Sequence, residues 1–232
     1  MGGGSVFFYL EPKTSILNDL NKELVITYKA VRDNPEKVYN LLTKMKSRHS
    51  KRFYYKVRES EPKSNLEIAA RMIYLNHTCF NGIYRVNREG KFNVPIGTDS
   101  RIISDDDKFL ERSRVLKNAS IKCEDFENII AKAKKGDFLF CDPPYAIRDK
   151  DVSISYNKTQ FTYDDQIRLA LAIEKARCKN VKIIMTNVNH ISIKKLYNRS
   201  KFKFIDAERH CMISGLNKGR SMYSELIITA NI

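Results

Sequence analysis

The chain has 232 residues, of which 42% are hydrophobic and 30% are charged, so it can bury a core in one domain, with or without a sizeable insertion. We expect no membrane span, because no apolar run is long enough to cross a bilayer. The five cysteines are scattered, with no CxxC pair and no histidine cluster beside them. This spacing argues against a disulfide framework or a zinc site and favours a reducing cytoplasm.

The net charge of +15, from 42 Lys and Arg against 27 Asp and Glu, predicts a polyanionic partner, and nucleic acid is the commonest one. The excess is concentrated between residues 44 and 63, where basic side chains alternate with Phe53, Tyr54 and Tyr55. Aromatic rings among basic residues suit a surface that follows a nucleic-acid backbone, although the same pattern also suits a plain amphipathic helix.

A glycine-rich turn opens the sequence and consists of Gly2, Gly3, Gly4 and Ser5. A turn of this kind that leads into a helix is a common cradle for a nucleotide or an anion. Residues 15–19 predict a short strand that ends in Asp19, and residues 21–31 predict a helix. An acid at a strand end soon after such a turn is well placed to hold ribose hydroxyls.

Residues 35–80 are predicted to be helical and basic, with a break around residues 59–64. Residues 81–97 are irregular, and their two halves, split by residues 88–90, could form a small hairpin. A predicted helix from about residue 105 to 117 then returns the chain to the sheet.

From residue 119 onward, strand and helix patterns alternate. The predicted elements are strand 119–122, helix 124–134, strand 138–141, polar loop 146–160, helix 163–177, strand 181–185 and a terminal hairpin of strands 202–213 and 224–230. This alternation predicts a doubly wound α/β domain that carries a helical, basic insertion from about residue 34 to 117.

The motif that runs from Asp142 through Pro143 and Pro144 to Tyr145 directly follows the apolar run 138–141, which predicts a buried strand that stops abruptly. Ligands bind at this edge of open α/β sheets. There a carboxylate can accept hydrogen bonds from an amino group, prolines stiffen the turn, and a tyrosine ring can stack on a flat heterocycle. On these residues alone, a plain strand end that proline terminates is an equally good interpretation.

Together these segments resemble the DNA adenine methyltransferases of the Dam type, nearly from end to end. The motifs that carry the resemblance are the glycine turn, Asn18-Asp19-Leu20-Asn21, Phe80-Asn81-Gly82-Ile83-Tyr84-Arg85 with Phe92-Asn93-Val94-Pro95, Cys123-Glu124-Asp125-Phe126 and Asp142-Pro143-Pro144-Tyr145. The last motif alone is moderately specific. Its combination with the two asparagine-containing segments, in this order, is highly specific.

The resemblance implies a Rossmann-like, S-adenosylmethionine-dependent methyltransferase sheet. Residues 1–33 and 118–232 would form the catalytic domain, and residues 34–117 a helical DNA-recognition insertion. The implied reaction transfers a methyl group from S-adenosyl-L-methionine to the exocyclic amino group of adenine in double-stranded DNA. The family's usual target is GATC, no metal is implied, and we favour a monomer.

The same resemblance implies roles for the motif residues. Asp142 and the Pro143 carbonyl would accept the two hydrogens of the adenine amino group, and Tyr145 would stack on the base; with Pro144 they form the catalytic motif. Asp19 would bind the cofactor ribose. The implied cofactor-binding residues are Gly2, Gly3, Gly4, Ser5, Asp19, Asp125, Phe126 and Asp142. For Asp125 the alternative is a helix cap.

The residues implied to bind DNA are Phe80, Asn81, Gly82, Ile83, Arg85 and Asn93. Arg85 would read a guanine edge, and Ile83 would touch a thymine methyl group. Phe80 and Asn81 would lie beside the flipped base. The alternatives are that Arg85 contacts phosphate and that Phe80 belongs to the core.

The sequence departs from the family pattern at its start. A cofactor turn should follow a strand, but Gly2 follows the initial methionine, and the upstream segment that ends in Gly-Gly-Lys is absent. We therefore expect the first strand to be missing and cofactor binding to be weak or absent. Two other functions stay open: a catalytically impaired DNA-binding remnant, and a different methyl acceptor. Relatives that modify protein glutamine or RNA tend to carry Asn at the position of Asp142, so the Asp favours DNA adenine.

Overall fold

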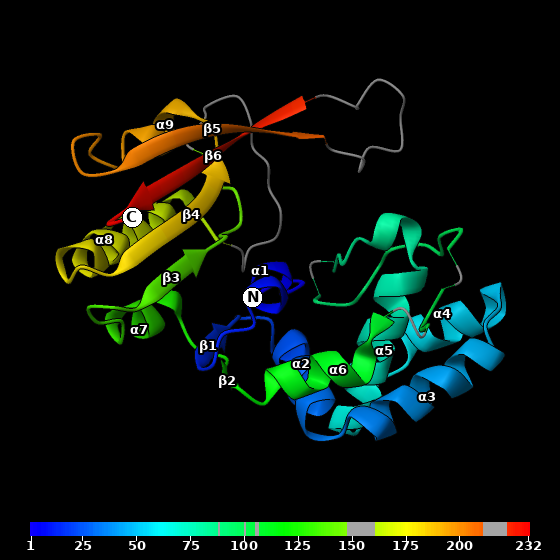
Figure 1. The fold of residues 1–232 in the computed structure, drawn as a ribbon. Helices are drawn as coiled ribbons and strands as arrows, with labels where there is room; N and C mark the ends of the chain where they lie inside the picture. The colour runs from blue at the N-terminus through cyan, green and yellow to red at the C-terminus, as the bar shows by residue number, and fades with distance from the viewer. Residues whose placement is uncertain (88, 100, 105–106, 148–160, 211–221) are drawn as a thin grey trace. The chain divides into compact units, whose positions relative to one another are not determined.

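The computed structural model describes residues 1–87, 89–99, 101–104, 107–147, 161–210 and 222–232. The chain divides into two compact units, an N-terminal unit of residues Met1–Glu124 and a C-terminal unit of residues Asp125–Ile232 (Figure 1). Both units contain helices and strands, so the predicted mixed α/β class is confirmed. No helix within the described ranges is long and apolar enough to cross a membrane.

The N-terminal unit contains two parallel strands, β1 (Ser15–Asn18) and β2 (Ala119–Lys122), both as predicted from the sequence. The Asn18 side chain extends this pairing. Its amide donates a hydrogen bond to the Glu124 carbonyl at 2.8 Å and accepts one from the Glu124 N–H at 3.0 Å. The strands on either side of the predicted insertion are therefore direct neighbours.

The helices of the N-terminal unit share one hydrophobic core, in which Leu42, Tyr54 and Tyr74 are the largest fully buried side chains of the middle helices. Helix α5 packs against α2, α3 and α4. The helices are α1 (Ser5–Leu10), α2 (Lys22–Asp33), α3 (Pro35–Ser47), α4 (Lys51–Glu59), α5 (Asn65–Thr78) and α6 (Phe109–Leu116).

The helical segment predicted over residues 35–80 is interrupted more often than expected. The break at residues 59–64 is confirmed, but the chain also breaks before α4, because Ser50 caps that helix by accepting from the Phe53 N–H at 3.2 Å. Helix α5 stops at Thr78 because Cys79 is extended. Helix α6 begins later than predicted, and residues 105–106 of that prediction lie outside the described ranges.

The aromatic side chains of the basic segment pack inward. Tyr54 is fully buried, and its hydroxyl donates to the Val94 carbonyl at 2.9 Å. Phe53 and Tyr55 pack against the same core. This segment is thus an amphipathic helix with a basic outer face, the second of the two interpretations that its sequence allows, and its rings do not form a stacking surface.

Residues 79–97 form a small antiparallel loop, as the sequence suggests. Isolated bridges join Val86 to Phe92 and Cys79 to Ile96, and a short 3-10 helix covers Phe80–Gly82. Residue 88, at the predicted turn, lies outside the described ranges. The bridges bring the two asparagine-containing motifs of the sequence side by side.

The C-terminal unit is built on a four-stranded sheet with the order β3-β4-β6-β5. Strand β3 is parallel to β4, whereas β6 is antiparallel to both β4 and β5. Helix α8 packs on one face, where Ile173, Ile183 and Leu226 are fully buried. The elements are α7 (Phe126–Ala131), β3 (Phe138–Cys141), α8 (Tyr163–Cys178), β4 (Lys182–Val188), α9 (Ile191–Lys194), β5 (Lys203–His210) and β6 (Met222–Ala230).

These elements confirm the predicted alternation, except for α9, which the sequence reading missed. Two predicted segments extend past the described ranges: residues 148–160 of the polar loop and residues 211–213 of the first hairpin strand. The prediction that residues 138–141 form a buried strand is wrong. Strand β3 lies at the edge of its sheet, and Phe138 and Phe140 are 44% and 37% exposed, because α8 covers the other face.

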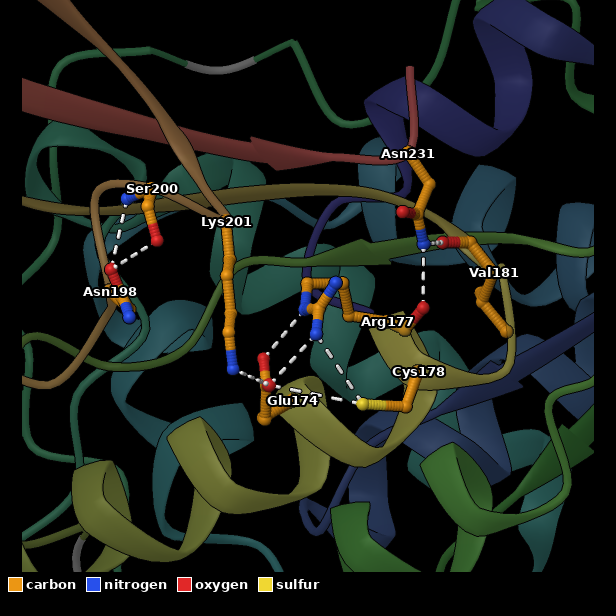
Figure 2. A network of polar contacts seen from close by, with 8 residues as sticks. All are labelled: Glu174, Arg177, Cys178, Val181, Asn198, Ser200, Lys201 and Asn231. Carbon is orange, nitrogen blue, oxygen red and sulfur yellow. Dashed lines mark hydrogen bonds and ion pairs between the residues drawn. The ribbon is translucent and has the colours of Figure 1, made fainter.

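The C-terminal end of α8 is tied to its neighbours by a polar network (Figure 2). The Glu174 carboxylate accepts from Arg177 Nε at 2.7 Å and from Lys201 Nζ at 3.1 Å. The bond from Arg177, helped by Lys201, lowers the pKa of Glu174 to about 2. The Asn231 amide donates to the carbonyls of Arg177 and Val181 at 2.9 and 2.8 Å, so the last strand is fastened to the start of β4.

Candidate functional site

The glycine turn lies at the N-terminus of α1, as predicted. Gly4 has a φ of +70°, and a Cβ atom there would lie 2.6 Å from the Tyr28 hydroxyl oxygen, so this position requires glycine. At Gly2 and Gly3 a Cβ would meet nothing within 4 Å. The Tyr28 hydroxyl donates to the Gly2 carbonyl at 2.9 Å. Burial, and then the nearby Asp19 charge, raise the pKa of Tyr28 to about 12.

Asp19 lies directly beside this turn. One carboxylate oxygen, Oδ2, accepts from the Gly2 N–H at 3.3 Å and contacts the Met1 amino group at 3.2 Å. The other, Oδ1, accepts from the Asn21 N–H at 2.9 Å. The structure therefore places Asp19, the predicted ribose-binding acid, next to the glycine turn, and Asp19 also stabilises the turn.

Asp125 and Phe126 lie at the start of α7. Asp125 caps the helix by accepting from the Glu127 N–H at 2.9 Å, which is the alternative role considered for it. Arg168 of α8, which the sequence reading missed, donates to Asp125 at 3.0 Å and to Glu127 at 3.1 Å. Its guanidinium carbon also lies 4.9 Å from the centre of the Phe126 ring. Asp125 and Phe126 are therefore held in place by α8.

The motif loop, residues 142–145, follows the edge strand β3. Thr186 Oγ1 donates to Asp142 Oδ1 at 2.6 Å, and the Tyr145 hydroxyl donates to Glu225 Oε1 at 3.1 Å. The Gln166 amide nitrogen lies 3.4 Å from the Pro144 carbonyl oxygen, to which it donates. The Tyr145 ring stays 43% exposed, so a flat ligand can reach it.

Thr186, Gln166 and Glu225 come from three elements of the C-terminal unit, and the sequence reading did not identify them. For Thr186 a signal did exist. It lies near the C-terminal end of β4, the strand parallel to β3, and the carboxyl ends of parallel strands meet at one edge of a sheet. No comparable rule points to Gln166 or Glu225.

The predicted DNA-binding residues lie together on the loop of residues 79–97. Arg85 Nε donates to the Asn93 side-chain oxygen at 3.0 Å, and the Asn93 N–H donates to the Arg85 carbonyl at 3.1 Å. Phe80 is exposed, which excludes the core role considered for it in this unit. The hydroxyl of Tyr84 donates to Glu23 Oε2 at 3.0 Å and anchors the loop to α2, a contact that the sequence reading missed.

No group of three or more metal-ligating side chains occurs among the residues that the structure describes. The polar groups of the predicted sites instead bind one another or the backbone. The acids Asp19, Asp125 and Asp142 each accept hydrogen bonds from uncharged donors; Asp19 also pairs with the Met1 amino group and Asp125 with Arg168.

Comparison with known proteins gives the class to which these elements and motifs belong. The model of the D12 class N6 adenine-specific DNA methyltransferases matches residues 1–213. The chain therefore belongs to this family and is an adenine-specific DNA methyltransferase. The predicted enzyme class and family are confirmed.

Its relatives include proteins that are named type II methyltransferases and proteins that are named DNA adenine methylases. A type II methyltransferase of Lactococcus lactis subsp. cremoris is 34% identical over 239 residues, which cover 99% of this chain and 84% of that protein. A type II methyltransferase of Methanocaldococcus jannaschii is 34% identical, with 98% and 86% covered. The DNA adenine methylase of Escherichia coli K12 is 26% identical, with 93% and 79% covered.

Proposed function

We propose that this chain transfers a methyl group from S-adenosyl-L-methionine to the exocyclic amino group of adenine in double-stranded DNA, within GATC. The observation that carries the proposal is the motif loop. It presents a carboxylate, prolyl carbonyls and an exposed aromatic ring at the C-terminal end of a parallel strand. These are the groups that hold a flat base by its ring and by its amino hydrogens.

The chemistry requires acceptors at the amino group. The adenine amino nitrogen is a poor nucleophile because its lone pair is delocalised into the ring. When Asp142 and the Pro143 carbonyl accept its two hydrogens, the lone pair is drawn out of conjugation and becomes available for direct displacement. Positioning and electrostatics then lower the barrier without a covalent enzyme intermediate. The base must first leave the duplex, which costs roughly a few kcal/mol, and Tyr145 offers it a stacking surface.

The methyl donor, which supplies an electrophilic methyl group when bound, is proposed to use the glycine turn and Asp19 of the N-terminal unit, with Asp19 at its ribose. A Cβ at Gly3 would meet nothing within 4 Å, which leaves room beside the turn. Ribose binding by Asp19 would share its carboxylate with the backbone N–H groups of Gly2 and Asn21. Within the C-terminal unit, Asp125 and Phe126, which α8 holds in place, are proposed to contact the adenine of the donor.

We also propose that residues 34–117 are a DNA-recognition insertion in a Rossmann-like catalytic domain of residues 1–33 and 118–232. The parallel pairing of β1 with β2 supports this division, because the two strands lie on either side of the insertion in the sequence. The parallel pairing of β3 with β4, joined through α8, supports a Rossmann-like sheet.

For target recognition, we propose that Arg85 reads a guanine edge with its terminal guanidinium nitrogens, while Nε stays on Asn93. Phe80, Asn81, Gly82 and Ile83 would lie against the DNA beside the flipped base. The support is that all these residues share one loop and that Phe80 is exposed. Replacing Arg85 should relax discrimination at one base pair by about 1–3 kcal/mol.

The cellular role follows the relatives that are named type II methyltransferases, and we propose a monomer that serves a type II restriction–modification system in the cytoplasm.

The deciding experiment is methyl transfer by the purified chain to a duplex that contains one GATC site, with a duplex lacking that site as the reference. We expect labelled methyl groups on the adenine of the GATC duplex. Asp142→Ala should abolish the transfer and leave DNA binding unchanged. Asp164→Ala is the matched control, because Asp164 is an exposed acid in the first turn of α8. Binding without transfer by the unaltered chain would identify a catalytically impaired remnant instead.

A further inference from the structure

The side chains that hold the motif loop come from three separate elements of the C-terminal unit. We define the motif clamp as Gln166 of α8, Thr186 and Asn187 of β4, and Glu225 of β6. We propose that these are positioning residues for methyl transfer, which act by orienting Asp142, Pro144 and Tyr145. This inference rests on the proposed function of the loop.

The inner half of the clamp is a buried amide pair. Gln166 and Asn187 are both 0% exposed. Gln166 Nε2 donates to Asn187 Oδ1 at 3.3 Å, and Asn187 Nδ2 donates to Gln166 Oε1 at 3.0 Å. Burying two amides is costly unless their polar atoms are bonded, and an apolar pair would fill the same space without that requirement. The pair therefore needs a reason beyond packing.

The backbone sets the direction of this pair. The Val188 N–H can only donate, and it donates to Asn187 Oδ1 at 2.9 Å. Asn187 must then present Nδ2 to Gln166 Oε1, which leaves Gln166 Nε2 as the donor to the Pro144 carbonyl. Gln166 thus holds the Pro144 carbonyl, which is adjacent to the Pro143 carbonyl that the proposed function assigns to the adenine amino group.

The outer half of the clamp lies on the other face of the sheet. Successive residues of a strand point to opposite faces, so Thr186 points away from Asn187 and α8. Val188 is paired with Glu225 across the antiparallel strands, which places Glu225 on the same face as Thr186. The motif loop is therefore held from both faces of one sheet.

These outer contacts orient the two reactive side chains. The Thr186 hydroxyl donates to Asp142 Oδ1, which limits rotation of the carboxylate and assigns the other oxygen, Oδ2, to the adenine amino group in the proposed reaction. The bond from the Tyr145 hydroxyl to Glu225 limits rotation of the stacking ring. Orientation of this kind matters because small displacements of reacting groups cost large factors in rate.

The test compares Thr186→Val with Thr186→Ser and with the control Thr229→Val. Thr186→Val removes the hydroxyl and keeps nearly the same shape, whereas Thr186→Ser keeps the hydroxyl. Thr229 is a suitable control because it lies on the same sheet face, opposite Ile184. Single-turnover methyl transfer should fall about tenfold or more in Thr186→Val, consistent with the loss of a hydrogen bond to a charged group. Thr186→Ser should recover most of the rate, and thermal midpoints and DNA affinity should stay close to those of the unaltered chain.

Hydrogen exchange of the peptide that covers residues 139–147 provides a readout independent of activity. It should become faster in Thr186→Val and in the double variant Gln166→Leu/Asn187→Leu, and it should stay unchanged in Thr229→Val. The double variant removes both amides together, which limits the cost of leaving one of them unpaired.

Each result bears on a different claim. Transfer and exchange within twofold of the unaltered chain in Thr186→Val would overturn the clamp while the proposed function stands. Equal losses of rate and thermal midpoint in Thr186→Val and Thr229→Val would overturn it too, because they indicate a merely structural effect. If the unaltered chain transfers no methyl group, the proposed function fails, and exchange alone still decides whether the clamp holds the loop.

Discussion

The glycine turn of the N-terminal unit and the motif loop of the C-terminal unit hold their acids in different ways. Asp19 accepts from the backbone N–H groups of Gly2 and Asn21, both of which lie in the first segment of the N-terminal unit. Asp142 accepts from the side chain of Thr186, which β4 brings from a distant part of the sequence. Asp19 therefore supports the backbone around it, whereas Asp142 is held by one side-chain hydroxyl. Removal of the two acids should change the free energy of unfolding to different extents.

The largest expected effect is the contrast between Asp142→Ala and Asp19→Ala. Asp142→Ala should reduce methyl transfer on the order of 10²–10³-fold or more, because it removes an acceptor for developing charge. It should change the free energy of unfolding by less than about 1 kcal/mol, since it leaves only the Thr186 hydroxyl without its partner. Single-turnover rates and urea unfolding measure both quantities.

Asp19→Ala, in contrast, should clearly lower the free energy of unfolding. It removes the acceptor of two backbone N–H groups and of the Met1 amino group, so we expect a loss of about 1–3 kcal/mol of stability. Comparable unfolding free energies for the two variants would break the distinction between a structural acid and a reactive one.

The next effect should appear within the glycine turn itself. Gly4→Ala places a Cβ against the Tyr28 hydroxyl in a left-handed conformation, and we expect a loss of about 2 kcal/mol of stability. Gly3→Ala, with nothing near its Cβ, should lie within about 0.5 kcal/mol of the unaltered chain. Urea unfolding of both variants measures this difference, and equal effects would mean that the turn does not need glycine at one particular position.

A smaller effect should appear at alkaline pH in the N-terminal unit. The pKa of Tyr28 is raised from 10.0 to about 12, so the folded state favours the neutral phenol. Its contribution to stability is complete below about pH 10 and is lost as the pH rises toward 12. Unfolding free energies measured across that range should fall less steeply in Tyr28→Phe than in the unaltered chain. An unchanged slope would assign the loss to other groups.

The smallest effect should appear at acid pH in the C-terminal unit. The pKa of Glu174 is lowered from 4.5 to about 2, mainly by Arg177, so the folded state favours the carboxylate. Its contribution is complete above about pH 4.5 and is lost as the pH falls toward 2. The effect is modest because the side chain is a third exposed. In Glu174→Gln, the free energy of unfolding measured in urea should depend less on pH below about 4.5. Asp164→Asn, which replaces an exposed acid of the same helix, should leave this dependence unchanged.

The local elements could be predicted because their signals lie within short stretches of sequence. The helix α2, the parallel strands β1 and β2, and the alternation from β3 to β6 follow from apolar spacing alone. The additional break before α4 was missed because the helical pattern continues on both sides of Ser50. A single serine that caps a helix is a weaker signal than that pattern. The edge position of β3 was missed because an apolar run looks the same whether one or two faces of the strand are covered.

The sequence by itself determined the family and the residues that carry its motifs, because those residues are short, ordered segments whose types the chemistry requires. Only the tertiary structure decided how the motif loop is held. Gln166, Thr186 and Glu225 reach it from α8, β4 and β6, and no periodicity records which strands become neighbours. The same reason explains Arg168, whose contacts with Asp125 and Glu127 exist because α7 and α8 pack together. Contacts between distant segments depend on how all the elements pack together, and no short stretch of sequence contains that information.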